Sequence, residues 1–143
     1  MKRNLLLLMT IVVAVNLLFS SCQKKKGCTD PNALNRDLVA EVNDGSCKYS
    51  NATFYASAGF FNGIPIVKID VTVNGRDIGT ISAIYSSAPG NCSAQGTVAY
   101  QFLDGNKIDW NTTVYLASGA TVSGSGQVSP SSVSDCIKVN VTR

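Results

Sequence analysis

Histidine is absent from the 143-residue chain. Catalytic arrangements of the Ser–His and Cys–His kind use an imidazole as the general base, so the sequence excludes them. Carboxylates are also few, because the chain has nine Asp and Glu residues, of which Glu41 is the only glutamate. A glycosidase-like pair of carboxylates stays open, since only folding could bring such a pair together. On this composition we predict that the protein is not an enzyme.

A strongly basic surface is missing once the start of the chain is set aside. The whole chain has 12 Lys and Arg against 9 Asp and Glu. Five of the basic residues lie within the first 26 positions, which leaves seven basic against nine acidic residues in the rest. Binding to nucleic acid depends on a positive surface that neutralises phosphates. We therefore expect no nucleic-acid partner.

The N-terminal residues have the layout of an export signal. Two basic residues precede a fifteen-residue run, "LLLLMTIVVAVNLLF", which is followed by the small residues Ser20 and Ser21. This order is typical of a secretory signal peptide. A membrane-spanning helix needs about 20 apolar residues. The run is shorter than that, and Asn16 interrupts it. We predict a signal peptide over residues 1–21 rather than a membrane anchor.

The cysteine after the two serines makes this signal more specific. Residues 18–22, "LFSSC", resemble the lipobox of bacterial lipoproteins, with Phe19 where Leu, Val or Ile is usual. The resemblance implies that cleavage leaves Cys22 as the N-terminus and that it carries the acyl chains, palmitate among them. Two or three acyl chains anchor a protein stably, because each buried methylene adds about 0.8 kcal/mol. The partner expected at this end is therefore a membrane.

Three lysines follow the lipidated position, at residues 24–26. They form either a solvated spacer or a contact with anionic headgroups, which attract such charges by about 1 kcal/mol each. In some groups of bacteria, acidic residues directly after the lipidated cysteine tend to mark export to the cell surface, and the three lysines have the opposite charge. The resemblance therefore implies an outer-membrane protein that faces the periplasm.

Four cysteines remain when Cys22 is set aside. An even number of cysteines in an exported chain indicates disulfides, and four cysteines allow three pairings. A zinc site is the alternative, but the chain has no CxxC pair and no histidine. The four residues are Cys28, Cys47, Cys92 and Cys136.

Oxygen-bearing side chains crowd between the first two of these cysteines. Ca²⁺ takes six to eight oxygen ligands, and a disulfide across the segment would hold them near one another. The spacing does not match an EF-hand loop, and Asp and Asn are also ordinary turn and capping residues. Both interpretations are kept. The candidate calcium ligands are Asp30, Asn32, Asn35 and Asp44.

From about Asn51 onward the chain is rich in Val, Ile, Thr, Ser, Tyr and Gly. Short alternating segments at a spacing of about 8–12 residues are typical of a β-sandwich. We predict an all-β fold, a sandwich of about seven antiparallel strands preceded by a short disulfide-closed segment. The strands are expected at residues 52–57, 66–73, 77–85, 96–102, 112–118, 121–128 and 136–142.

The segment "IVKIDVTV" has the clearest alternation. It predicts that Val67, Ile69, Val71 and Val73 share one face of the sheet, because side chains alternate between the faces of a strand. Asn74-Gly75 follows directly and is a strong hairpin signal.

In the returning strand, Gly79 predicts a β-bulge, since glycine inside a strand often marks one.

Aromatic residues are the remaining sign of binding. Phe60 and Phe61 precede an Asn62-Gly63 turn, and Trp110 follows the Asp104-Gly105 turn. An exposed aromatic ring can stack on a sugar or grip a protein partner, so Trp110 is a candidate ligand contact.

Two stretches resemble families of exported Bacteroidetes proteins. The first, Gly27 to Cys47, resembles a cysteine-bracketed repeat that reads GCTDP.A.NY, a short spacer and A...DDGSC. Arg36 replaces its tyrosine, and Asn43 replaces the first aspartate of its pair. The resemblance implies a Cys28–Cys47 disulfide and brings no activity with it. The matching residues are Gly27-Cys28-Thr29-Asp30-Pro31, Ala33, Asn35 and Asp44-Gly45-Ser46-Cys47.

The second stretch is similar to a small β-sandwich domain of Bacteroidetes lipoproteins. Cys136 takes the position of its late cysteine, which implies a Cys92–Cys136 disulfide. The chain departs from the pattern at Val122-Ser123-Gly124, where Trp-Ser-Gly is frequent, and it lacks a cysteine near Thr97. Such domains are like the carboxypeptidase-regulatory-like and PEGA-type sandwiches, which act as appendages and spacers. The matching residues are Asn74-Gly75, Gly79-Thr80-Ile81, Tyr85-Ser86-Ser87-Ala88-Pro89 and Cys92.

Together these features predict a lipid-anchored protein of the cell envelope, a non-catalytic structural or binding module with a protein or glycan ligand and no cofactor. The alternative is a calcium-stabilised adhesion or carbohydrate-binding module, which depends on the acidic segment and on Trp110. The predicted divisions are a signal peptide (1–21), a lipidated cysteine with a basic tether (22–27), a disulfide-bracketed segment (28–49) and a β-sandwich (51–143).

The protein purified from membranes is expected to begin at Cys22, to carry acyl mass there, and to have four other cysteines that are alkylated only after reduction. Intact-mass spectrometry with and without reduction before alkylation measures all three properties. A chain that begins elsewhere and carries no lipid contradicts the lipobox interpretation.

Overall fold

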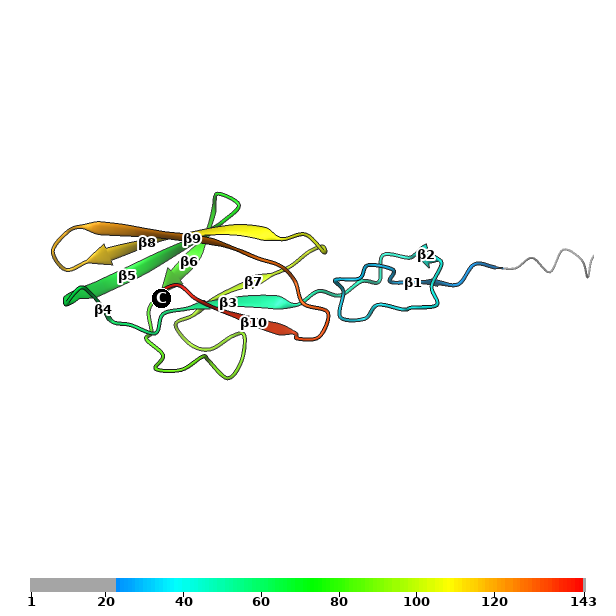
Figure 1. Ribbon diagram of the computed structural model, residues 1–143, viewed down its shortest axis with the longest axis horizontal. Helices are drawn as coiled ribbons and strands as arrows, with labels where there is room; N and C mark the ends of the chain where they lie inside the picture. Colours follow the sequence, from blue (N-terminus) through cyan, green and yellow to red (C-terminus); the bar gives the residue numbers. More distant parts are fainter. Residues whose placement is uncertain (1–22, 143) are drawn as a thin grey trace, which may run out of the picture.

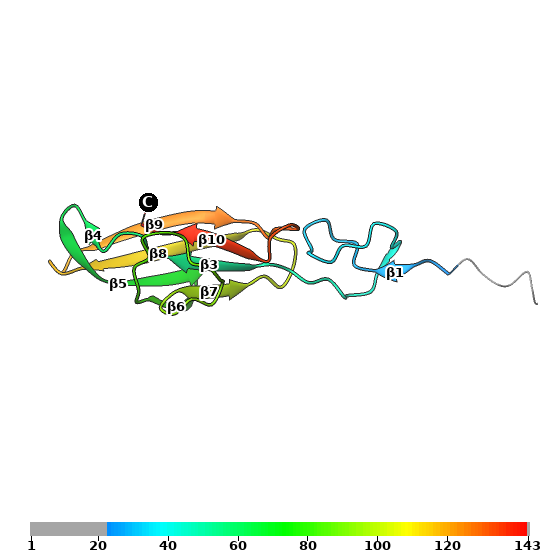
Figure 2. The ribbon, with the colours of Figure 1, turned by 90° about the horizontal axis from the view of Figure 1, so that it is seen from below.

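The computed structural model describes residues 23–142, which form a long, narrow all-β molecule (Figure 1). A β-sandwich makes up most of its length, and a small disulfide-closed unit continues the long axis at one end (Figures 1 and 2). The predicted signal peptide and Cys22 lie outside the described residues. The predicted all-β class is confirmed, and both predicted disulfides are present.

The larger sheet of the sandwich is antiparallel. Strand β5 pairs with β8 along one side and with β6 and β4 along the other, and β8 pairs in turn with β9 at the edge. The strands are β4 (Phe60–Phe61), β5 (Ile64–Val73), β6 (Arg76–Ile81), β8 (Ile108–Leu116) and β9 (Thr121–Val128).

The smaller sheet has the order β10-β3-β7, with β3 at Asn51–Tyr55, β7 at Val98–Gln101 and β10 at Cys136–Asn140. Strands β3 and β7 are antiparallel, but β3 and β10 are parallel, which departs from the predicted antiparallel arrangement. These are the first and last strands of the sandwich. The whole domain connects them, so no tight turn imposes an antiparallel pairing.

The core lies between the two sheets. Phe54 from the smaller sheet and Ile69 and Val71 from the larger one are its largest fully buried apolar side chains. Each such side chain stabilises the fold by about 1.5–3 kcal/mol when it leaves water. The buried cluster is completed by Ala52, Ala56, Val73, Ile81, Val98, Phe102, Ile108, Val114, Leu116 and Val141.

The predicted hairpin and bulge between β5 and β6 are confirmed. Asn74 and Gly75 both have positive φ, 50° and 79°, as the tight two-residue hairpin turn requires. Gly79, at φ 138°, lies where the pairing of β5 with β6 shifts register. Glycine adopts such a φ without the steric penalty that a Cβ would add.

The prediction that Val67 of β5 faces the core is wrong. Ile69, Val71 and Val73 are buried as predicted, but Val67 is 68% exposed. The register with β8 shifts between Ile66 and Lys68, and Ile66 packs against the core instead. A bulge inserts an extra residue and reverses the alternation beyond it.

The N-terminal unit is closed by the Cys28–Cys47 disulfide and by two short parallel strands, β1 (Lys26–Gly27) and β2 (Val42–Asn43). The backbone N–H of Glu41 donates to the Lys25 carbonyl at 2.8 Å. The Lys25 ammonium also lies 3.0 Å from the Asp37 carboxylate. The contacts of the folded unit therefore begin at Lys25, within the stretch predicted as the basic tether (22–27).

The Cys92–Cys136 disulfide joins the loop between β6 and β7 to the start of β10, with 5.5 Å between the two Cα atoms. In the same place, the hydroxyl of the buried Thr53 donates to the Cys92 carbonyl at 2.6 Å. The loop and the first and last strands of the sandwich are thus held together by a covalent bond and a buried hydrogen bond.

Most predicted strands are present with shifted ends. The prediction for 121–128 matches β9, whereas β8 begins at Ile108 rather than near residue 112. Strand β6 ends at Ile81, because the backbone N–H groups of Ser82 and Ala83 both turn to the Gly96 carbonyl. A strand end that is set by contact with a distant loop has no signal in the local sequence.

Replacing both Cys92 and Cys136 by serine is expected to lower Tm by at least about 10 °C. The bond closes a loop that spans a sequence separation of 44 residues. A closure of this length stabilises by about 4 kcal/mol, and 1 kcal/mol corresponds to roughly 4–8 °C in a domain of this size. Circular dichroism melting under non-reducing conditions measures the change, with the Cys28→Ser, Cys47→Ser variant as the matched comparison. An unchanged Tm contradicts the prediction.

Candidate functional site

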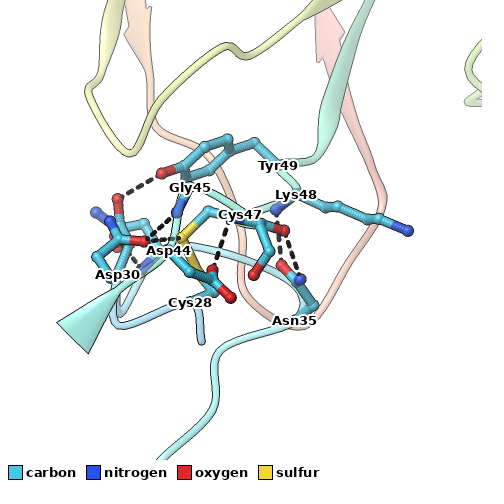
Figure 3. Close-up of a disulfide and its surroundings, with 11 residues drawn as sticks. Cys28, Asp30, Asn35, Asp44, Gly45, Cys47, Lys48 and Tyr49 are labelled. Carbon is cyan, nitrogen blue, oxygen red and sulfur yellow. Dashed lines mark hydrogen bonds between the residues drawn. A yellow bond between two sulfur atoms is a disulfide. The ribbon is translucent and has the colours of Figure 1, made fainter. Parts of the chain in front are cut away.

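Asp30 and Asn32, two of the predicted calcium ligands, face the end of the sandwich. The Asp30 carboxylate accepts hydrogen bonds from the backbone N–H of Asn32 and the Tyr49 hydroxyl, both at 2.8 Å (Figure 3). The Asn32 amide donates to the Gly105 carbonyl at 2.9 Å, in the loop between β7 and β8. The pKa of Tyr49 is raised, mainly because its hydroxyl donates to the Asp30 carboxylate. The bond from Asn32 to Gly105 fastens the N-terminal unit to the sandwich.

The other two predicted ligands, Asn35 and Asp44, hold the chain around Cys47 (Figure 3). The Asn35 side chain donates to the Ser46 carbonyl at 2.8 Å and accepts from the Lys48 N–H at 2.7 Å. The Asp44 carboxylate accepts from the Ser46 N–H at 2.9 Å. Both side chains thus act as clamps on the backbone beside the disulfide.

Hydrogen bonds to two carboxylates of this unit lower their pKa values. The pKa of Asp44 falls below its usual 3.8, first because of its bond with the Ser46 side chain and then because of the Ser46 backbone N–H. The pKa of Asp37 falls mainly because Lys25 donates to it. A carboxyl with a lowered folded-state pKa stabilises the fold above its unfolded pKa. That contribution is lost as pH falls through the folded-state value.

The four predicted ligands therefore fall into two pairs with separate tasks, one at the sandwich and one at Cys47. Within residues 23–142, no group of three or more His, Cys, Asp or Glu side chains forms a metal-binding cluster. The side-chain oxygens of Asp30, Asn35 and Asp44 accept hydrogen bonds from the chain itself, as those of capping residues do, and the Asn32 amide donates to the Gly105 carbonyl.

Trp110 lies within β8 and not in a loop after a turn. Its ring is half-buried and meets the Phe54 ring edge-on, with the centroids 6.0 Å apart. It also covers Gly126 on β9, where an added Cβ would lie 2.6 Å from a ring carbon. Much of the indole is thus used in packing, and its role as a ligand contact stays a prediction.

The exposed aromatic residues of the sandwich are Phe60 and Phe61, at 63% and 41% exposure. They border an apolar cleft of about 160 Å³ at the end of the sandwich far from the N-terminal unit. The cleft also involves Ile66 of β5, Val122 of β9 and Val141 just after β10, and among residues 23–142 no charged side chain lines it. The sequence showed the two phenylalanines beside a turn but not the cleft, to which β4, β5, β8, β9 and the residues after β10 contribute.

Carboxylates of the sandwich are engaged by their neighbours. Asp70 lies 2.8 Å from the Lys68 ammonium and accepts from the Thr80 hydroxyl at 2.6 Å, and the pKa of Asp70 is lowered mainly by Lys68. Asp77 accepts from the Gly79 N–H at 2.9 Å. Asp109 accepts from a Gln127 amide at 2.6 Å. These carboxylates thus form an ion pair and hydrogen bonds with neighbouring residues on the surface.

Comparison with protein-family models, with curated proteins and with solved structures found no match. Among residues 23–142, no helix is long and apolar enough to span a membrane.

Addition of calcium is expected to change Tm by less than about 1 °C, because the oxygens of Asp30, Asn35 and Asp44 already accept hydrogen bonds from the chain. Binding with a Kd near 10 μM would instead stabilise by about 2.7 kcal/mol at about 1 mM calcium. Calorimetry in calcium and in EDTA distinguishes the two outcomes.

The control for this measurement is the Asp30→Asn, Asp44→Asn variant. A rise in the Tm of the unchanged chain with calcium, absent from this variant, would establish the calcium site.

Proposed function

We propose that the chain is a lipid-anchored, non-catalytic accessory protein of the bacterial cell envelope that presents a protein-binding surface away from the membrane. The observation that carries the proposal is the position of the Phe60–Phe61 cleft. It lies at the opposite end of the long molecule from the N-terminal unit, which the predicted anchor directly precedes (Figures 1 and 2).

The build of the N-terminal unit supports this role. The unit begins at Lys25, three residues after the predicted lipidated cysteine, so little chain separates it from a membrane. The Cys28–Cys47 bond and the clamps at Asn35 and Asp44 stiffen it. The bond from the Asn32 amide to the Gly105 carbonyl links it to the sandwich. A stiff unit of this kind serves as a spacer.

Two further features favour a binding role over catalysis. Neighbouring side chains and backbone groups engage Asp70, Asp77 and Asp109, and acid–base catalysis needs carboxyl groups aimed at a substrate. The cleft is apolar and is flanked by exposed rings, and aromatic side chains often anchor protein partners. The rival function, a calcium-stabilised adhesion or carbohydrate-binding module, depends on Asp30, Asp44 and Trp110, which have contacts within the chain.

A photocrosslinking phenylalanine analogue at position 60 is expected to form covalent adducts with an envelope protein in intact cells. The matched control places the same analogue at Val133, which is 93% exposed and lies in the loop between β9 and β10. That loop approaches the N-terminal unit (Figure 1). Mass spectrometry identifies the adducts. Equal labelling from both positions, or none from position 60, contradicts the proposed binding end.

A further inference from the structure

Strand β9 is the edge of the larger sheet, since it pairs with β8 alone. An edge strand presents a row of backbone N–H and C=O groups that another strand can use. In an antiparallel pair, every second residue turns both groups toward its partner and the residues between turn them away. The direction of these groups along β9 therefore determines what it can bind.

The hydrogen bond from the Leu116 N–H to the Ala120 carbonyl, at 2.9 Å, sets the alternation at the β8–β9 turn. Counting from it along the ladder, the residues that direct both backbone groups away from β8 are Thr121, Ser123, Ser125 and Gln127. Within residues 23–142, the backbone N–H groups of these four make no hydrogen bond to the rest of the chain.

Strand β9 also lacks the features that usually protect an edge. Natural edges are blunted by charged residues, proline, bulges or short length. β9 is eight residues long and has no charge or proline, and its register with β8 is unbroken. The opposite edge, β6, has Arg76 and Asp77 and the bulge at Gly79. β10, the edge of the smaller sheet beside β9, has Lys138 at an exposed position.

The apolar cleft adjoins this edge. Val122, Ser123 and Gly124 of β9 line it together with Val141 and the exposed Phe61. A strand laid along β9 directs every second side chain to the inner side of the sheet, where the cleft opens. A cavity of about 150 Å³ accommodates a benzene ring. The cleft, at about 160 Å³, therefore has room for one large apolar side chain.

We propose that β9 accepts an extended, uncharged segment of another protein as an added antiparallel strand, with one large apolar side chain of that segment in the Phe60–Phe61 cleft. This deepens the binding role proposed above and rests on it for the nature of the partner. Main-chain hydrogen bonds supply affinity in this mode of recognition, and the pocket supplies specificity.

A second copy of the chain fits this edge less well. Two identical β9 strands related by a two-fold axis pair antiparallel. Because β9 runs along the long axis of the molecule (Figure 1), that pairing would place the two N-terminal units at opposite ends. Two chains anchored in one membrane cannot adopt this arrangement, so the occupant is a segment of a different protein.

The test uses the mature chain and a panel of ten-residue peptides of threonine and serine, capped at both ends, with Leu, Phe, Ile, Met or Ala at a central position. Amide chemical shifts measured by NMR locate the contact. We expect the amides of Thr121, Ser123, Ser125 and Gln127 to shift, and the peptides with a large apolar residue to bind more tightly than the alanine peptide.

Ser125→Pro is the decisive variant, because proline is tolerated in an edge strand where its missing N–H faced solvent. It should weaken binding by about tenfold, equivalent to the 1.4 kcal/mol expected for lost main-chain contacts. Ser125→Thr keeps the N–H and should bind like the unchanged chain. N-methylation of alternate peptide amides gives the same test with an unaltered protein, should Ser125→Pro fail to fold.

Three results would overturn the proposal. The first is the absence of amide chemical-shift changes on β9 with any peptide at millimolar concentration, and the second is changes that persist in the Ser125→Pro variant. The third is a dimer of the unchanged chain that the Ser125→Pro substitution dissociates. Crosslinking from position 60 in cells together with no peptide binding at β9 would leave the binding role intact and reject only the added strand.

Discussion

The disulfide between Cys92 and Cys136 is the constraint on which the sandwich depends most. It attaches the last strand to the loop between β6 and β7, and β10 pairs parallel to β3. A hairpin could not set that pairing, because the two strands are separated by the rest of the domain. The chain just after β10 then supplies Val141, which contributes both to the core and to a wall of the apolar cleft.

The glycines of β9 affect both the packing against β8 inside the sandwich and the lack of bulky side chains at the edge of the sheet. A Cβ at Gly124 would lie 2.8 Å from the Thr112 hydroxyl, and one at Gly126 would meet the Trp110 ring. The inner face of β9 therefore has no side chain at Gly124 or Gly126, and side chains of β8 occupy that volume. The same residues, with the serines between them, leave β9 without charge or bulk on its open side.

The proposed spacer and the proposed binding surface lie in different parts of the molecule. The N-terminal unit uses its polar side chains on itself and on the sandwich, through Asp30, Asn32, Asn35 and Asp44. The apolar cleft and the open edge of β9 lie on the sandwich, and no charged residue of the described part of the chain lines the cleft. Exposed apolar surface beside unpaired backbone groups is costly to leave open, and a partner strand would cover both.

The sequence by itself determined the all-β class, the hairpin at Asn74-Gly75 and the bulge at Gly79, because alternation and positive φ are local properties. It also indicated both disulfide pairs, through resemblance to a cysteine-bracketed repeat and to a small β-sandwich domain. Only the tertiary structure decided that Val67 is exposed and that Trp110 packs within β8. It alone assembled the cleft, since β4, β5, β8, β9 and the residues after β10 meet there. Contacts between distant strands leave no trace in local periodicity.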